Sequence, residues 1–184
     1  MRMAYKPAAL LLIMFLSACA TTHSTKEPRV EGERLSFVLQ DLAGQTVASL
    51  DERFVGKVVL VTLWGSWCQP CVSEIPTFND LQARYGIDGL EIVAIAFEKE
   101  SDATVRNDHL REFSTKHAIR YLVLDGGSTS DFSTALPTMD DVEGLPVEIL
   151  IGRDGVVVDT RNGYGYSEAW AQGVENRLKT LLAD

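Results

Sequence analysis

Two stretches of the chain, residues 58–64 and 90–97, are almost entirely apolar and rich in β-branched side chains. Uninterrupted apolar runs of this length are typical of strands that are covered on both faces, as in a parallel sheet. Between them, apolar residues recur at steps of three and four, which predicts a helix with one buried face. These residues are Val72, Ile75, Phe78, Leu81 and Tyr85. The three segments together predict a right-handed βαβ unit.

The rest of the pattern predicts shorter elements on both sides of this unit. Residues 35–40 alternate and residues 47–50 return after a turn at 43–45, which predicts an N-terminal β-hairpin. Asp154-Gly155 marks a second hairpin turn between two apolar stretches. The other predicted elements are an amphipathic helix at 101–118, a strand at 121–124, a helical turn near 131–136 in the polar stretch 126–143, strands at 147–151 and 156–159, and a closing helix at 167–182 with Ser167 as N-cap.

The start of the chain has the layout of a secretory signal. Arg2 and Lys6 precede the apolar run 8–16, which is too short to cross a bilayer and is followed by small residues. Residues 16–19, Leu-Ser-Ala-Cys, resemble the lipobox of bacterial lipoproteins, which implies cleavage before Cys19 and lipid on its sulfur. An ordinary cleaved signal and an uncleaved short anchor stay open as alternatives. We expect a lipoprotein signal peptide at residues 1–18, a lipidated flexible tether at 19–34 and a folded domain at 35–184.

A lipidated Cys19 would hold the protein in the bacterial cell envelope, since more than one acyl chain gives stable attachment to a membrane. The domain is then expected to face the periplasm. Ala20 follows Cys19 where lipoproteins retained in the inner membrane of enteric bacteria carry aspartate, so the resemblance favours the outer membrane.

Composition and charge argue against one class of partner, nucleic acids. The chain has 184 residues, of which 46% are hydrophobic and 23% charged, as is typical of a globular protein. Its formal net charge is −9, and no cluster of lysine and arginine offsets this charge. Proteins that bind nucleic acid carry basic surfaces, so we expect no nucleic-acid partner.

Cys68 and Cys71 lie where the first buried strand gives way to the predicted helix. The free amides and the dipole at a helix N-terminus favour thiolate over thiol, so Cys68 is the expected nucleophile, open to solvent. Residues three apart in a helix are about 5–6 Å apart at Cβ, which allows a disulfide between the two cysteines. A bond that closes so short a loop adds little stability. Redox cycling is therefore favoured, and an inert disulfide stays as an alternative hypothesis.

Metal binding is the main alternative for these thiols. Zinc would need further ligands, and the three histidines, His23, His109 and His117, form no ligand cluster by spacing. Copper needs only two thiolates and stays open. The two thiols need neither a cofactor nor a metal for disulfide exchange, and we expect none.

Three motifs resemble the thioredoxin superfamily, and more narrowly its TlpA/ResA-like membrane-anchored thiol–disulfide oxidoreductases. They are Trp67-Cys68-Gln69-Pro70-Cys71, the following Glu74-Ile75-Pro76, and Gly144-Leu145-Pro146 before a strand that ends in residues 151–155. The resemblance runs from about residue 35 to the C-terminus. It implies an α/β protein with the thioredoxin-like fold: a central mixed β-sheet flanked by helices, with the N-terminal β-hairpin as an extension.

The resemblance also assigns residues that bind the substrate. Pro146 is expected to follow a cis peptide bond and to pack against the disulfide. The neighbouring backbone of Leu145 is then free to pair with an extended segment of a substrate protein. Trp67 is expected to form part of the apolar rim on which a partner docks.

Glu74 lies one helical turn after Cys71, and family members are thought to use a glutamate at this position. If buried, it would have a raised pKa and could relay a proton to or from the Cys71 thiol. An acid in a first turn also suits the helix dipole, so a purely structural role stays open. Thioredoxin has a buried aspartate six residues before its first cysteine, where this chain has Thr62.

The expected function is thiol–disulfide exchange with exported proteins, in the reducing direction that the family comparison favours. Apocytochrome c is one substrate that the resemblance suggests, and a membrane protein is expected to donate the electrons. A periplasmic copper carrier is the first alternative. A thiol peroxidase is the second, although the Thr-x-x-Cys pattern of peroxiredoxins is absent before Cys68.

Overall fold

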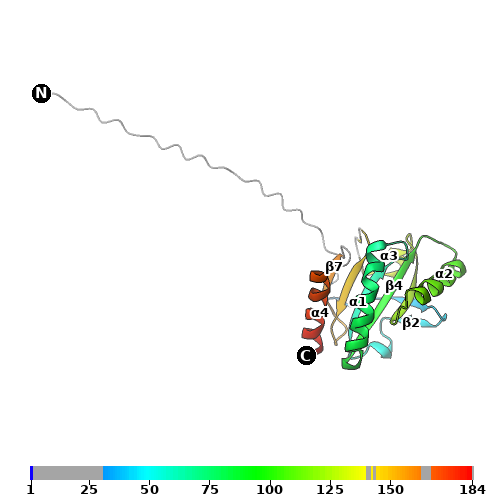
Figure 1. Cartoon of the computed structure of the whole chain (residues 1–184), viewed down its shortest axis with the longest axis horizontal. Helices are drawn as coiled ribbons and strands as arrows, with labels where there is room; N and C mark the ends of the chain where they lie inside the picture. The colour runs from blue at the N-terminus through cyan, green and yellow to red at the C-terminus, as the bar shows by residue number, and fades with distance from the viewer. Residues whose placement is uncertain (2–30, 140–141, 143, 163–166, 184) are drawn as a thin grey trace.

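A seven-stranded mixed sheet runs through the middle of the molecule, with its strands in the order β2-β1-β5-β4-β3-β6-β7 (Figure 1). The computed structural model describes residues 1, 31–139, 142, 144–162 and 167–183. The strands are β1 (Val38–Asp41), β2 (Thr46–Ala48), β3 (Val58–Trp64), β4 (Leu90–Glu98), β5 (Leu122–Ser128), β6 (Val147–Ile151) and β7 (Val157–Asn162). The helices are α1 (Gln69–Tyr85), α2 (Ala103–Lys116), α3 (Phe132–Ala135) and α4 (Glu168–Ala183), with 3-10 turns η1 (Glu52–Phe54) and η2 (Gly86–Asp88).

β3 and β4 form the centre of the sheet and pair in parallel, from Val58 opposite Leu90 to Trp64 opposite Ala96. Because α1 connects them, the predicted βαβ unit is confirmed. On the other side of β3, β6 pairs antiparallel with β3, and β7 pairs antiparallel with β6. The hairpin predicted from Asp-Gly is therefore also present, and it places β6 beside the strand that leads to the cysteines.

The two faces of the sheet hold separate parts of the core. On one face, Leu60 of β3 packs with Phe78 of α1 and Leu178 of α4. Further along the same face, Trp64 clusters with Leu110 of α2. α1, α2 and α4 thus cover this face, and the segment before β1 and α3 cover the other (Figure 1). Alternate residues of β3 face opposite layers, so the continuous apolar run matches a strand buried on both sides.

The bounds of several strands differ from the sequence prediction, most of all in β1 and β5. β1 begins at Val38, not at residue 35, and β5 continues to Ser128 through a stretch that was predicted to be loop. A side chain at Gly126 would come within 2.8 Å of Ile95 and Phe97, so glycine lets β5 lie against β4 there. Ordered contacts also begin before β1, because the N–H of Gly32 donates to the carbonyl oxygen of Val157 over 2.9 Å.

The predicted signal peptide and Cys19 lie outside the described residues, as does the tether up to residue 30. In the part of the chain that the structure describes, no helix is both long enough and apolar enough to span a bilayer.

Helix α2 has a strong N-terminal cap in Asp102. Its carboxylate accepts hydrogen bonds from the N–H groups of Thr104 and Val105, over 2.9 and 3.0 Å. We expect Asp102→Ala to lower the free energy of unfolding by about 1 kcal/mol, because two helix amides lose their partner. Chemical denaturation measures the change. Asp108→Ala is the matched control, because it removes an exposed carboxylate that is paired with Arg111 in the same helix. It should lower the free energy of unfolding by only a few tenths of a kcal/mol. Equal losses in the two variants would contradict the capping role.

Candidate active site

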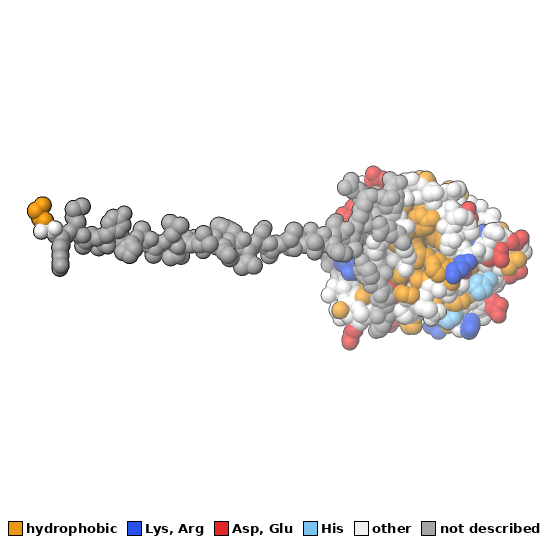
Figure 2. All heavy atoms as spheres, turned by 90° about the horizontal axis from the view of Figure 1, so that it is seen from above, with side chains coloured by type: hydrophobic (Ala, Val, Ile, Leu, Met, Phe, Trp, Pro, Cys, Tyr) orange, Lys and Arg blue, Asp and Glu red, His pale blue; other side chains and the backbone are white. Residues whose placement is uncertain are grey.

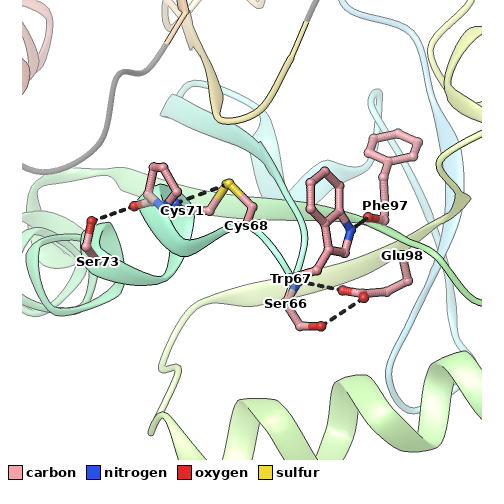
Figure 3. The surroundings of a disulfide bond; sticks show 8 residues. Ser66, Trp67, Cys68, Cys71, Ser73, Phe97 and Glu98 are labelled. Carbon is pink, nitrogen blue, oxygen red and sulfur yellow. Dashed lines mark hydrogen bonds between the residues drawn. A yellow bond between two sulfur atoms is a disulfide. The ribbon is translucent and has the colours of Figure 1, made fainter.

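The end of β3 and the start of α1 bring the two cysteines together. Cys68 is the N-cap of α1, and its sulfur accepts a hydrogen bond from the N–H of Cys71 over 3.3 Å (Figure 3). The two residues form a disulfide, with 5.3 Å between their Cα atoms. Pro70 stands in the first turn, where its missing N–H costs no helical hydrogen bond. The predicted pairing at a helix N-terminus is therefore what the structure shows.

The expectation that Cys68 is open to solvent is wrong for this disulfide form. Cys68 is only 5% exposed and Cys71 only 3%. They belong to an apolar cluster that includes Trp64 and Ile75, with Leu145 packed against it. A disulfide carries no charge and packs like an apolar group, whereas the predicted exposure was argued for a thiolate, which needs solvation. Little of either sulfur-bearing residue is therefore exposed to an approaching substrate.

The loop between β3 and Cys68 is held by a buried carboxylate that sequence reasoning missed. Glu98, at the end of β4, accepts hydrogen bonds from the N–H and the hydroxyl of Ser66 over 2.7 and 2.8 Å (Figure 3). The Ser66 hydroxyl also lies 2.8 Å from Nε2 of His109, so this histidine is anchored to the loop. An acid directly after the apolar run 90–97 was the available signal. These bonds fix the backbone two residues before the first cysteine.

Trp67 lies on the rim of the site and is 39% exposed. Its indole N–H donates to the carbonyl oxygen of Phe97 over 2.9 Å (Figure 3). The Lys99 ammonium lies 5.0 Å from the ring centroid. Gly65 permits this arrangement, because a Cβ there would meet the indole nitrogen at 2.5 Å. Figure 2 looks onto the end of the molecule where α1 begins and shows exposed hydrophobic side chains there. The Trp67 ring is thus fixed in place and partly exposed beside the disulfide.

The segment before β6 lies against the same site. The Leu145–Pro146 peptide bond is cis, as the resemblance implied. Leu145 is partly buried and packs against the cluster that contains both cysteines. The predicted substrate-binding residues Trp67, Leu145 and Pro146 thus lie around the buried disulfide.

Glu74 is fully buried, with 0% of its surface exposed. Both carboxylate oxygens lack a hydrogen-bond partner among the described residues. Burial, together with the nearby charge of Glu148, raises the pKa of Glu74 to about 8. Burial was the condition that the sequence interpretation set for proton transfer with Cys71, and the structure meets it. The transfer itself stays a prediction.

The comparisons with known proteins agree with this geometry. The Redoxin family matches residues 29–178. The thiol-disulfide oxidoreductase ResA of Bacillus thuringiensis subsp. konkukian is 31% identical over 159 residues, which are 85% of this chain and 82% of that protein. The ResA of Bacillus cereus strain ATCC 10987 is 32% identical over the same shares of the two chains.

Solved structures are similar as well. A thiol:disulfide interchange protein of the thioredoxin family from Chlorobium tepidum superposes with a TM-score of 0.65 at 23% identity, over 83% of this chain and 97% of that one. A DsbF homologue from Corynebacterium diphtheriae superposes with a TM-score of 0.64 at 18% identity, over 80% and 85%. These likenesses confirm the predicted fold.

Proposed function

The chain belongs to the Redoxin family and has a thioredoxin-like fold, and we propose that Cys68 and Cys71 cycle between dithiol and disulfide to exchange disulfides with other proteins. The protein is a thiol–disulfide oxidoreductase, the activity for which its ResA relatives are named. One observation carries the cycle: the disulfide lies at the first turn of α1, where the helix terminus stabilises the thiolate released on reduction.

In the reducing direction, the Cys68 thiolate attacks a substrate disulfide and forms a mixed disulfide, and the other substrate sulfur leaves as a thiolate. Cys71 then loses its proton to the ionised Glu74 carboxylate. The Cys71 thiolate attacks Cys68, the mixed disulfide breaks, and the second substrate sulfur leaves as a thiolate. Two electrons thus pass to the substrate, and the protein is left with the Cys68–Cys71 disulfide.

Disulfide-containing proteins are the substrates. In the proposed complex, an extended substrate segment lies along the backbone of Leu145 at Pro146, and an apolar part of it contacts Trp67. Exported proteins, with apocytochrome c among them, are the specific substrates that we propose from the family resemblance. A membrane protein that donates electrons would return the pair to the dithiol.

The proposal includes a location in the bacterial cell envelope, with the domain facing the periplasm on a lipid anchor at Cys19. Its support is the sequence pattern of residues 1–19. Ala20 after the lipidated cysteine favours the outer membrane over the inner one. Metabolic labelling with a fatty acid tests the anchor: label that persists in Cys19→Ser would contradict it.

A dithiothreitol-coupled insulin reduction assay on the full chain tests the function. We expect catalysed precipitation of insulin well above the rate with dithiothreitol alone. Titration with Cu(I) is run beside it, because a copper carrier would bind the metal stoichiometrically through the same two thiolates and show no turnover. Copper retention without turnover would overturn the proposal, and so would turnover with a peroxide but not with insulin.

Trp67 offers a prediction on substrate docking. We expect Trp67→Ala to raise the KM for insulin roughly three- to tenfold with little change in kcat, because an aromatic contact at the rim is lost. Trp67→Phe keeps the ring but not the hydrogen bond to Phe97, and it should lie closer to the wild type. Steady-state kinetics at several insulin concentrations give both constants. A fall in kcat at unchanged KM would instead place Trp67 in the chemical step.

A further inference from the structure

A second buried acid, Glu148, lies on β6 two residues after Pro146 and is 3% exposed. It stands opposite Thr62 in the antiparallel pairing of β3 and β6. The indole N–H of Trp170 on α4 donates a hydrogen bond to its carboxylate. A carboxylate is rarely buried this deeply, so Glu148 calls for an explanation.

Glu148 and Glu74 face the same buried layer. On β3, Thr62 stands between Leu60, which clusters with Phe78 of α1, and Trp64, which clusters with Cys71. On α1, Glu74 likewise stands between Cys71 and Phe78. Glu74 therefore faces the part of the sheet that carries Thr62 and Glu148. The Thr62 hydroxyl and both Glu74 oxygens lack hydrogen-bond partners among the described residues.

The charged groups around the two acids differ. Glu74 is approached by Tyr121, from the segment before β5, and by Glu148. Glu148 is approached by Asp159 and Arg161 of β7 and by Arg177 of α4, and together with them it lines a small depression in the surface. The two arginines favour the ionised form of Glu148, whereas Glu74 has no cation among these neighbours.

These surroundings fix the order in which the two acids ionise. Burial raises the pKa of both acids, but the Trp170 N–H, Arg161 and Arg177 oppose this rise at Glu148, whereas the charge of Glu148 adds to it at Glu74. Glu148 therefore ionises first, and its negative charge then opposes the ionisation of Glu74.

We propose that Glu148 is a positioning residue for the thiol chemistry: it forms one coupled acid pair with Glu74, and its charge sets the pH range in which Glu74 can take the proton of Cys71. The inference rests on the proposed function. In the resolving step, the proton moves from the Cys71 sulfur to Glu74, and the thiolate closes the disulfide as described above. Glu74 afterwards releases the proton to water. Glu148 lies at the depression between β7 and α4. Glu148 itself touches neither sulfur nor substrate.

Glu148→Gln tests the pair, because glutamine keeps the shape and can still accept the Trp170 hydrogen bond but carries no charge. The side-chain carboxyl carbons are titrated by NMR in the oxidised full chain, where Cys68 and Cys71 carry no thiol. We expect two-step titration curves for Glu74 in the wild type. In Glu148→Gln, the Glu74 curve should become a single step at lower pH. Glu91→Gln is the matched control, since it removes a β4 carboxylate that is paired with Lys57. It should leave the Glu74 titration curve unchanged.

The second readout is the pH profile of the resolving step, measured by rapid quenching of the mixed disulfide. In Glu148→Gln, the ascending limb should move to lower pH and raise the rate at pH 6 roughly three- to tenfold. Glu74→Gln gives a reciprocal test that does not depend on the folding of Glu148→Gln. In that variant the side-chain carboxyl carbon of Glu148 should titrate in one step.

The outcomes separate the two proposals. An unchanged Glu74 titration in Glu148→Gln, with insulin turnover intact, would overturn the acid pair and leave the function standing. Coupled titrations in a wild type that reduces no insulin would overturn the function, since the carboxyl titration requires no turnover.

Discussion

Cys68→Ser is expected to lower the rate of insulin reduction by at least roughly 10³-fold, because the hydroxyl of serine does not replace the thiolate as nucleophile. Cys71→Ser should fail at a different point. Its Cys68 can still attack a substrate, but no second thiol is present to release it. This variant should accumulate as a mixed disulfide with substrate protein, which a non-reducing gel and mass spectrometry detect.

The difference between the two variants tests the assignment of roles. If Cys71→Ser formed no mixed disulfide while Cys68→Ser did, the nucleophile would be Cys71 and the helix-terminus argument would be wrong. Cys19→Ser is the matched control, since it removes the third cysteine of the chain and should leave turnover of the detergent-solubilised protein unchanged.

The second large effect is on stability as a function of pH. In the unfolded chain Glu74 ionises near its ordinary pKa of 4.5, whereas in the folded protein its pKa is about 8. Between these values the folded state holds a proton that the unfolded chain has lost. The contribution of Glu74 to stability is thus fully present below pH 4.5 and is lost as the pH rises to 8. Glu148 adds to the same trend, because its pKa is raised to about 7.

We therefore expect Glu74→Gln to become more stable relative to the wild type as the pH rises, with a gain on the order of a few kcal/mol at pH 8.5. Urea unfolding of the oxidised proteins at pH 4.5, 6.5 and 8.5 measures the difference, in which the titrations of groups that are not coupled to Glu74 cancel. Glu91→Gln again serves as control and should show no such trend. A difference that does not vary with pH would mean that Glu74 is ionised in the folded protein throughout this range.

Much of the fold follows from local pattern. The buried strands β3 and β4, the amphipathic helix α1 and the Asp-Gly hairpin are each encoded within a few neighbouring residues, and all were predicted. The end of β5 was not, because Gly126 and Gly127 are typical of loops. Gly126 fits into the strand because Ile95 and Phe97 of β4 stand where its side chain would otherwise be. That contact joins residues about 30 positions apart, and no local pattern contains it.

In the site, too, local sequence predicts some features, and others depend on contacts between residues far apart in the chain. The spacing of Cys68 and Cys71 is local and predicted their disulfide. Glu98 holds Ser66 across 32 residues, and Glu148 reaches the layer of Glu74 only through the pairing of β6 with β3. Sequence reasoning therefore found the reacting sulfurs and Glu74, but not Glu98 or Glu148. It also predicted an open Cys68, because it argued from the needs of a thiolate and not from the packing of a neutral disulfide.

The burial of Cys68, at 5% exposure, has a consequence for selectivity. The rate of thiol–disulfide exchange depends on access to the sulfur under attack. Glutathione and similar small thiols gain nothing from the docking surface of Trp67 and the backbone of Leu145, whereas a protein that docks there is held beside the disulfide. We therefore expect the pair to exchange faster with proteins that dock at this surface than with monothiols such as glutathione.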